Sequence, residues 1–310
     1  MGSVLSTSCA PVRWERLARF YGLACSGAVL CSLAAHRLVN PAAKMSMAAL
    51  MMLTPLMAGT VVQKSYGEPT LEAMGVRRGG LFSRWGLLAA LTPAAFVASA
   101  LVASLAVPGV RCAPGEAMIA SIVAAGGSQE QVDQIRCFVA APPLEIVQKS
   151  LLKAVVVGGI VNIIPCFGEE VGWRGWLLRE LAPLGFWRAS LISGAMWGLW
   201  HAPLTIQGHN YPQHPGAGIA MMTAFCALLS PSMTLLRWKS RSVWSAAIFH
   251  GVLNAGGALP MLMLAGGNDL TIGVTGLAGL LVLAGANVTI FALCGDDIRP
   301  VLEDAWVAKQ

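Results

Sequence analysis

The stretch CFGEEVGWRGWLL, residues 166–178, places two adjacent carboxylates, Glu169 and Glu170, between apolar segments. The chain has 310 residues, of which 56% are hydrophobic and 12% are charged, whereas soluble domains carry about 25% charged residues. A soluble core of this size would need more polar surface. The composition therefore predicts a polytopic helical membrane protein, in which ionisable residues inside the spans mark function.

Apolar segments long enough to cross a membrane recur along the chain. A span needs about 20 mostly apolar residues, and we identify eight candidates at about 20–38, 45–63, 86–107, 150–167, 189–206, 217–236, 243–263 and 271–294. Backbone groups in lipid must be hydrogen bonded internally, so each span is expected to be a helix. The predicted fold is an all-α transmembrane bundle. Asn162 and Asn287 lie in apolar runs and predict hydrogen bonds between helices.

The distribution of Lys and Arg predicts the orientation. With the N-terminus inside, 15 of these residues fall on the cytoplasmic side and 6 on the other, which together are the 21 of the chain. The positive-inside rule then gives a multi-pass protein of the bacterial cell membrane with both termini cytoplasmic. The expected surroundings are the lipid bilayer, and no basic–aromatic pattern indicates a nucleic-acid partner.

The polar segment 108–149 lies outside in this topology and contains Cys112 and Cys137. An extracytoplasmic location permits a disulfide between these two residues. The alternative is that both are free thiols, and the sequence leaves the two states open.

Three pairs of residues four apart would each share one face of a helix. They are Glu170 with Arg174, Trp197 with His201, and His250 with Asn254. Pairing with Arg174 would keep Glu170 ionised, whereas Glu169 projects about 100° away around the helix axis and lacks that partner. A partly desolvated carboxylate can take a proton from water and later return it. Glu169 is therefore the candidate base.

His201 and His250 lie in different apolar segments. Together with Glu169 they could hold a metal, because two His and one carboxylate make an open zinc site. Alternatively, the imidazoles and Asn254 could donate hydrogen bonds to a water molecule and to a developing oxyanion. Both arrangements suit amide hydrolysis, and the residues do not choose between them. No segment predicts an organic cofactor.

The three pairs also carry a family resemblance. EEVGWR resembles the EExxxR motif of the CAAX-processing and bacteriocin-processing intramembrane proteases, known as the CPBP or ABI family, and WGLWH and HGVLN resemble that family's FxxxH and HxxxN or HxxxD motifs. Their order and spacing also agree. The resemblance covers about residues 150–260. One departure is visible: Trp197 stands where the family usually has Phe.

The resemblance implies a membrane-embedded endopeptidase and assigns the roles of its residues. Glu169 would activate water with the help of His201, while His250 and Asn254 would stabilise the oxyanion. Glu170 and its arginine partner would support the site. The implied substrate is a membrane-anchored peptide or protein, including the CAAX type.

Three regions follow from the spans and the motifs. We expect N-terminal transmembrane helices with a cytoplasmic connector and a polar extracytoplasmic loop in 1–149, a CPBP-like catalytic core in 150–263, and a final transmembrane helix with a cytoplasmic tail in 264–310. Two other functions fit the same residues: an inactive family member that acts as an immunity or scaffold protein, and a proton-coupled transporter. A transporter would show two repeated halves, and the sequence shows none.

The predicted depths of the site residues conflict. At about 1.5 Å per residue, His201 would lie roughly 20 Å from the cytoplasmic start of its span and His250 about 10 Å, while Glu169 would sit at the cytoplasmic end of its own. These side chains can meet only if the helix that carries Glu169 is displaced inward. Pro165 and Gly168 permit a break there, and irregular backbone is tolerated where it lines a cavity.

Overall fold

The computed structural model describes residues 11–68, 71, 73–77 and 82–294. The long helices are α1 (Trp14–Arg37), α2 (Pro41–Ser65), α3 (Arg84–Ser104), α6 (Pro143–Ile160), α9 (Gly185–Trp200), α11 (Pro215–Ser240), α12 (Val243–Gly256) and α14 (Leu277–Cys294). The shorter helices are α4 (Glu116–Ala124), α5 (Gln129–Val139), α7 (Ile163–Glu170), the π-helix η2 (Val171–Leu177), α8 (Leu178–Leu181), the 3-10 helix η3 (Ala182–Leu184), α10 (Ala202–Thr205) and α13 (Leu259–Met263). The prediction of an all-helical membrane bundle is confirmed.

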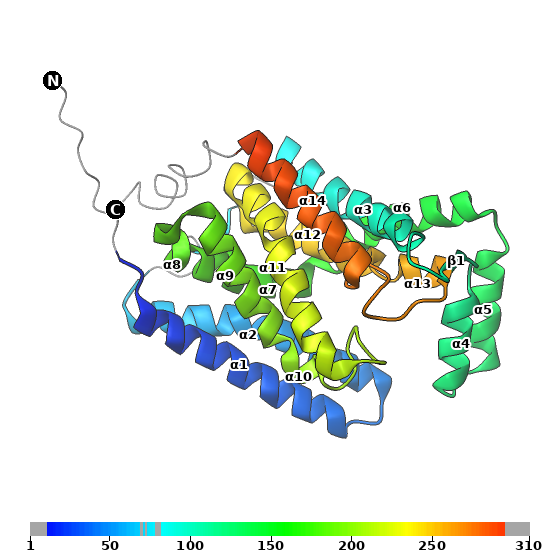
Figure 1. Ribbon diagram of the computed structural model, residues 1–310. Coiled ribbons are helices and arrows are strands. Elements are labelled where there is room, and N and C mark those ends of the chain that lie inside the picture. Colours follow the sequence, from blue (N-terminus) through cyan, green and yellow to red (C-terminus); the bar gives the residue numbers. More distant parts are fainter. Residues whose placement is uncertain (1–10, 69–70, 72, 78–81, 295–310) are drawn as a thin grey trace.

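The bundle is organised around α12, which packs against α3, α6, α7 and α11. α7 lies between α12 and α2, and α1 and α9 pack against α2 and α11 respectively. Figure 1 shows the long helices running side by side. Large apolar side chains such as Leu30, Leu87 and Val288 are exposed on the outer faces. Such extensive exposed apolar surface is what a lipid-facing perimeter requires.

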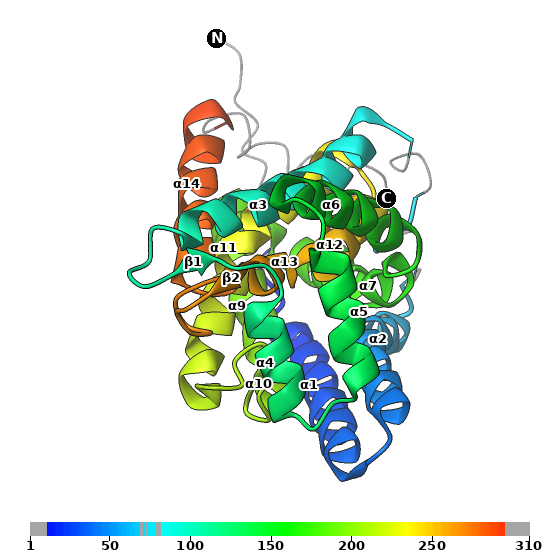
Figure 2. The same ribbon diagram turned by 90° about the vertical axis from the view of Figure 1, so that its right-hand side faces the viewer.

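One end of the bundle is covered by the segment between α3 and α6. There β1 (Arg111–Cys112) pairs antiparallel with β2 (Leu264–Ala265), and α4 and α5 lie across the ends of the long helices (Figure 2). α5 begins with a capping box between Ser128 and Gln131, which satisfies two backbone donors reciprocally. Cys112 and Cys137 are both exposed and free, so the disulfide is not formed in this structure.

The structure does not confirm the expected count of eight spans. In the described part of the chain, five helices are long and apolar enough to cross a membrane, or six spans if one bent pair is included. That pair joins α6 to the segment Ile163–Trp200, so the predicted spans 150–167 and 189–206 fall within one bent unit. Within the described residues, the apolar helix Leu277–Ala292 is shorter than a span. Hydropathy alone cannot separate a bent unit from two crossings.

The bend brings α7 into the interior. α6 ends at Ile160, α7 begins at Ile163, and the two arms meet at 61°. A side chain at Gly168 would meet Leu53 and the Met52 carbonyl oxygen, which lie midway along α2. The expected inward displacement is therefore present. Its break lies at residues 161–162, before Pro165.

Two hydrogen bonds between helices match their predictions. The Asn162 amide donates to the Gly251 carbonyl oxygen at 3.5 Å, and the Asn287 amide donates to the Leu228 carbonyl oxygen at 2.9 Å. The first bond secures the α6–α7 break against α12. The second joins α14 to α11.

A charged network joins the start of α1 to the connector after α2 and to α8. Glu68 accepts hydrogen bonds from Arg16 at 2.7 and 3.1 Å and from Arg13 at 3.2 Å. Glu180 accepts from Arg13 at 2.7 Å and from Arg179 at 3.0 Å. These bonds fix the far end of the α7–α8 arm, and the arm in turn carries Glu169 and Glu170.

Replacing Glu68 with Gln should lower stability at neutral pH but not in acid. The hydrogen bond from Arg16 holds the pKa of Glu68 at about 2, below its ordinary value of 4.5. A group whose pKa is lowered by folding contributes stability that is full above pH 4.5 and is lost as the pH falls toward 2. The measurement is the Tm of both proteins in detergent across this range. Glu15→Gln, which removes an exposed pair with Arg19, should barely change Tm; a pH-independent loss in Glu68→Gln would contradict the prediction.

Replacing Gly158 with Ala should destabilise the contact between α6 and α12. A methyl group there would meet the backbone of Gly251 and Val252, which cannot move aside as a side chain can. Overpacking of this kind costs about 1–3 kcal/mol. Gly159→Ala is the matched control, because its added methyl meets nothing within 4 Å. Thermal unfolding of the two variants compares them, and equal Tm values would show that the close approach carries no stability.

Candidate active site

Glu169 and Glu170 end α7, immediately before the π-helix η2. Both are almost fully buried, with 2% and 0% of their surface exposed. Short π-helical segments are rare and often lie at functional sites. Gly172 and Gly175 in η2 pack against Pro55 and the Met74 backbone, where larger residues would collide. The glycines therefore let this acidic helix approach the rest of the bundle.

Glu170 is the centre of a buried ionic cluster. Arg174 Nη1 lies 3.1 Å from the Glu170 carboxylate, and His250 Nδ1 lies 2.9 Å from Oε1. Arg174 Nη2 also donates to Ser230 Oγ at 3.3 Å. The predicted Glu170–Arg174 pair is thus present, and the contact with His250 extends it from α7 and η2 to α12. A carboxylate buried this completely needs such partners to remain charged.

Glu169 has a different partner. Its Oε2 accepts a hydrogen bond of 2.7 Å from the indole Nε1 of Trp197 on α9. The sequence predicts that Glu170 pairs with Arg174 and that Glu169 does not, and this geometry agrees with that prediction. Its two oxygens are not equivalent, because the indole engages one of them.

His201 joins the cluster through Trp197. Its Nδ1 lies 2.9 Å from the Trp197 carbonyl oxygen, and the two rings are 5.6 Å apart between centroids. The carbonyl can only accept, so this contact places the proton on Nδ1 and leaves Nε2 as the acceptor. His201 and Glu169 are therefore linked through the same tryptophan and share no hydrogen bond with each other.

Asn254 lies one turn beyond His250 on α12 and, unlike the other candidate residues, is exposed. Its Nδ2 donates to Cys166 Sγ at 3.6 Å. Cys166 is fully buried on α7, three and four residues before the two glutamates. Asn254 is thus the candidate site residue that lies at the exposed surface.

The structure does not arrange the predicted metal ligands as a trio. Among the residues it describes, no group of three or more His, Cys, Asp or Glu side chains could hold a metal ion. Glu169 is directed to Trp197, His250 to Glu170 and His201 to a carbonyl oxygen. The zinc version of the site therefore remains a prediction.

Two contributors to this cluster, Cys166 and Ser230, were not predicted from the sequence. Trp197 was predicted to share a helix face with His201, but the hydrogen bond from its indole to Glu169 was not predicted. A signal existed for Trp197, because Trp has an N–H group that Phe lacks. For Cys166, its spacing from both glutamates was the available clue.

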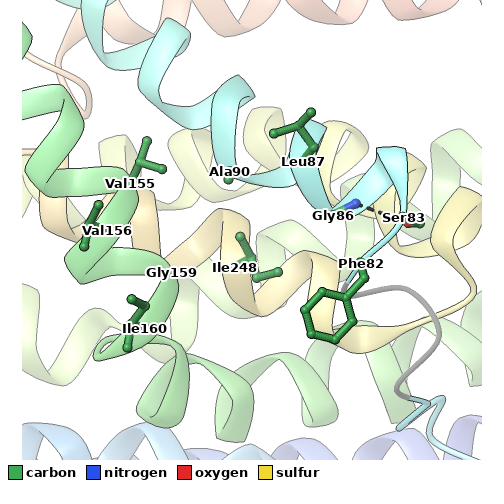
Figure 3. A pocket seen from close by; sticks show the side chains of 10 residues that line it. All are labelled: Phe82, Ser83, Gly86, Leu87, Ala90, Val155, Val156, Gly159, Ile160 and Ile248. Atoms are coloured by element: carbon green, nitrogen blue, oxygen red, sulfur yellow. Dashed lines mark hydrogen bonds between the residues drawn. The ribbon is translucent and has the colours of Figure 1, made fainter.

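An apolar groove of about 370 Å³ lies elsewhere on the bundle, between α3, α6 and α12 (Figure 3). Ile248 lines it from α12. Ile248 and His250 are two residues apart on a helix and so project about 200° from each other. The groove therefore lies on the opposite side of α12 from the ionic cluster and is not the candidate active site.

The fold and the cluster define a multi-pass membrane protein with two carboxylates and two imidazoles buried inside its helical bundle. Residues 151–256 match the family model described as Type II CAAX prenyl endopeptidase Rce1-like. A CAAX prenyl protease 2 from Methanococcus maripaludis is 30% identical over 92 residues, which cover 28% of this chain and 34% of that protein. The chain thus matches about a third of the relative's length. These matches agree with the resemblance read from the motifs: the segment 151–256, which contains every candidate site residue, is similar to the CPBP-family proteases.

Replacing Arg174 with Met should destabilise the protein more than replacing both Arg174 and Glu170 with neutral residues. Removing one partner of a buried ion pair leaves the other charge uncompensated, at a cost of about 3–5 kcal/mol. The double variant Glu170→Gln with Arg174→Met removes both charges and should recover part of the loss. Thermal unfolding of the single and double variants measures the coupling. Strictly additive losses would contradict the ionic cluster.

Proposed function

We propose that the protein is an intramembrane endopeptidase that hydrolyses a peptide bond in a membrane-associated protein or peptide. The observation that carries the proposal is the meeting of Glu169, His201 and His250 around Trp197, with Glu170 bound to His250, inside the helical bundle. Charged and imidazole groups are costly within membrane spans and are retained there for function. The four residues come from three separate parts of the chain.

In the proposed mechanism, Glu169 is the general base. With Oε2 held by the Trp197 indole, Oε1 faces the attacking water and removes its proton. His201 assists from Nε2, because its Nδ1 is committed to the Trp197 carbonyl oxygen. Glu169 then returns the proton to the leaving amine, as a general base does in the second half of amide hydrolysis.

His250 and Asn254 stabilise the tetrahedral intermediate in this mechanism. The Glu170 carboxylate accepts from His250 Nδ1, so in the protonated imidazolium Nε2 also carries a proton and can donate to the oxyanion. Asn254 supplies a second donor one turn along α12. Donors fixed before the reaction are worth about 10²- to 10³-fold each in kcat, because they need no reorganisation as charge develops. Arg174 contributes indirectly by keeping Glu170 in place.

The proposed substrate is anchored in the membrane. α7 packs at the middle of α2, so a peptide that reaches Glu169 must enter the bundle to that depth. In this proposal the peptide approaches from the side on which Asn254 is exposed. The matched relative is named a CAAX prenyl protease, and we propose a lipid-anchored C-terminal peptide as the substrate class to assay first.

Glu169→Gln should abolish cleavage while leaving the fold and substrate binding intact. The amide oxygen of Gln can still accept from the Trp197 indole, but the side chain can no longer take a proton. We expect kcat to fall by about 10²- to 10⁴-fold. The assay is cleavage of a prenylated CAAX peptide in proteoliposomes, with binding of the same peptide measured separately.

Glu145→Gln is the matched control, because Glu145 forms an exposed pair with Lys149 on α6 and should keep full activity. A wild-type protein that binds the peptide and cleaves none would support the scaffold function instead. Proton-coupled uptake into the same liposomes would support a transporter.

Metal analysis, together with the cleavage assay repeated in the presence of a chelator, separates the two protease types. One zinc per chain with chelator-sensitive cleavage favours the metal version, and chelator-insensitive cleavage favours the glutamate version.

A further inference from the structure

Trp197 contacts four of the six candidate site residues. Its indole donates to Glu169, its ring lies under the Arg174 guanidinium at 4.3 Å, and its centroid is 5.6 and 5.2 Å from those of His201 and His250. The side chain is 2% exposed. The second motif of the resembled family usually has Phe at this position, and Phe has no N–H group. The hydrogen bond from the indole N–H to Glu169 is therefore a feature of the tryptophan in this chain.

We propose that Trp197 is a positioning residue that holds the Glu169 carboxylate for water activation and joins the two halves of the site. This inference rests on the proposed function. One half is Glu169 with His201, and the other is the cluster of Glu170, Arg174 and His250.

The hydrogen bond to Glu169 is the first support. At 2.7 Å it is as short as charge-assisted N–H···O bonds are. Among the described residues, Trp197 is the hydrogen-bond partner of this carboxylate. The bond therefore fixes Oε2 on the indole and leaves Oε1 to bind water. Without this bond the Glu169 carboxylate could rotate about its side-chain torsions. A catalytic group must be held within about 0.5 Å of its productive position.

The contact with Arg174 is the second support. A guanidinium 4.3 Å from an indole centroid lies within cation–π range, for which Trp is the best aromatic partner. Arg174 also binds Glu170, so the same indole reaches Glu169 through its N–H and Glu170 through Arg174. The two adjacent carboxylates are thereby kept on different partners and in different orientations.

The contacts with the imidazoles are the third support. His201 and His250 both approach the Trp197 ring edge-on, with interplanar angles of 60° and 72°. The Trp197 carbonyl oxygen also fixes His201 Nδ1. Tilted pairs at this separation are favourable beyond simple burial. Trp197 thus sets the spacing between the residue that assists the base and the residue that faces the oxyanion.

The test compares Trp197→Phe with Trp176→Phe. Trp176 is equally buried, donates from its indole to Gln63 Oε1 at 3.0 Å and stacks on Phe20, so its indole N–H serves a different partner from that of Trp197. Both variants lose one buried indole donor, so their effects on folding should be similar. Only Trp197→Phe should lower kcat, by about 10- to 100-fold, since a hydrogen bond to a charged group is lost. KM should stay within about twofold, because the lost interaction acts on water activation and not on substrate binding.

A second measurement needs no substrate. The difference UV resonance Raman spectrum between wild type and Trp197→Phe should show a strongly hydrogen-bonded indole N–H, and Glu169→Gln should weaken that signal. Unchanged kcat in Trp197→Phe, equal losses in both Trp variants, or a loss confined to KM would overturn the positioning role. A weakly bonded indole in the spectrum would do the same. If the wild type cleaves nothing, the proposed function fails, while the spectrum still decides whether Trp197 holds Glu169.

Discussion

A carboxylate with no exposed surface, Glu170, lies among apolar helices because Arg174 and His250 hold it there. Taking such a group out of water costs several kcal/mol, and only close partners of opposite charge or with donor groups offset that cost. The partners come from η2 and from α12, so the ionic contact also fixes how these two elements meet. The same contact sets the positions of two further residues. Glu169 directly precedes Glu170 in the chain, and Asn254 lies one turn from His250 on α12.

The glycines of the acidic helix make the contact reachable. Gly168, Gly172 and Gly175 follow one another along α7 and η2, and each faces a neighbour that leaves no room for a side chain. In membranes, helices approach closely where small residues line the interface, because van der Waals packing replaces the hydrophobic effect as the driving force. The sequence GEEVGWRG therefore combines two requirements: small residues for close packing and charged residues for the site. The π-helix η2 begins directly after the two glutamates and contains Gly172 and Gly175, so the charged residues and the small packing residues adjoin there.

Local spacing predicted part of the site. Residues four apart share a helix face, so the Glu170–Arg174 pair could be read directly from the sequence. The contact between Glu170 and His250 joins residues 80 positions apart and depends on how α7 packs on α12. The bond from Trp197 to Glu169 spans 28 positions and depends on the chain returning through α9. Such contacts are set by tertiary packing, which local periodicity does not encode.

The count of eight spans was not confirmed, for a related reason. Hydropathy detects apolar length, but the 61° bend between α6 and α7 makes two apolar segments into arms of one unit. The need for an inward displacement could be deduced, because the site residues would otherwise lie at different depths. The position of the break could not, since Pro165 was the obvious breaker and the helix in fact resumes before it, at Ile163.

The hairpin of α4 and α5 has little anchorage in the bundle. α4 buries none of its residues and α5 buries Val132, whereas α12 is buried along most of its length. Regions with few buried apolar contacts open at a much lower free energy than the core around them. Backbone amides in residues 116–139 can therefore exchange with solvent through local opening, without unfolding the helices that carry the carboxylates. An epitope or reporter inserted at the turn of this hairpin would therefore move with a segment that opens independently of the helices that carry Glu169 and Glu170.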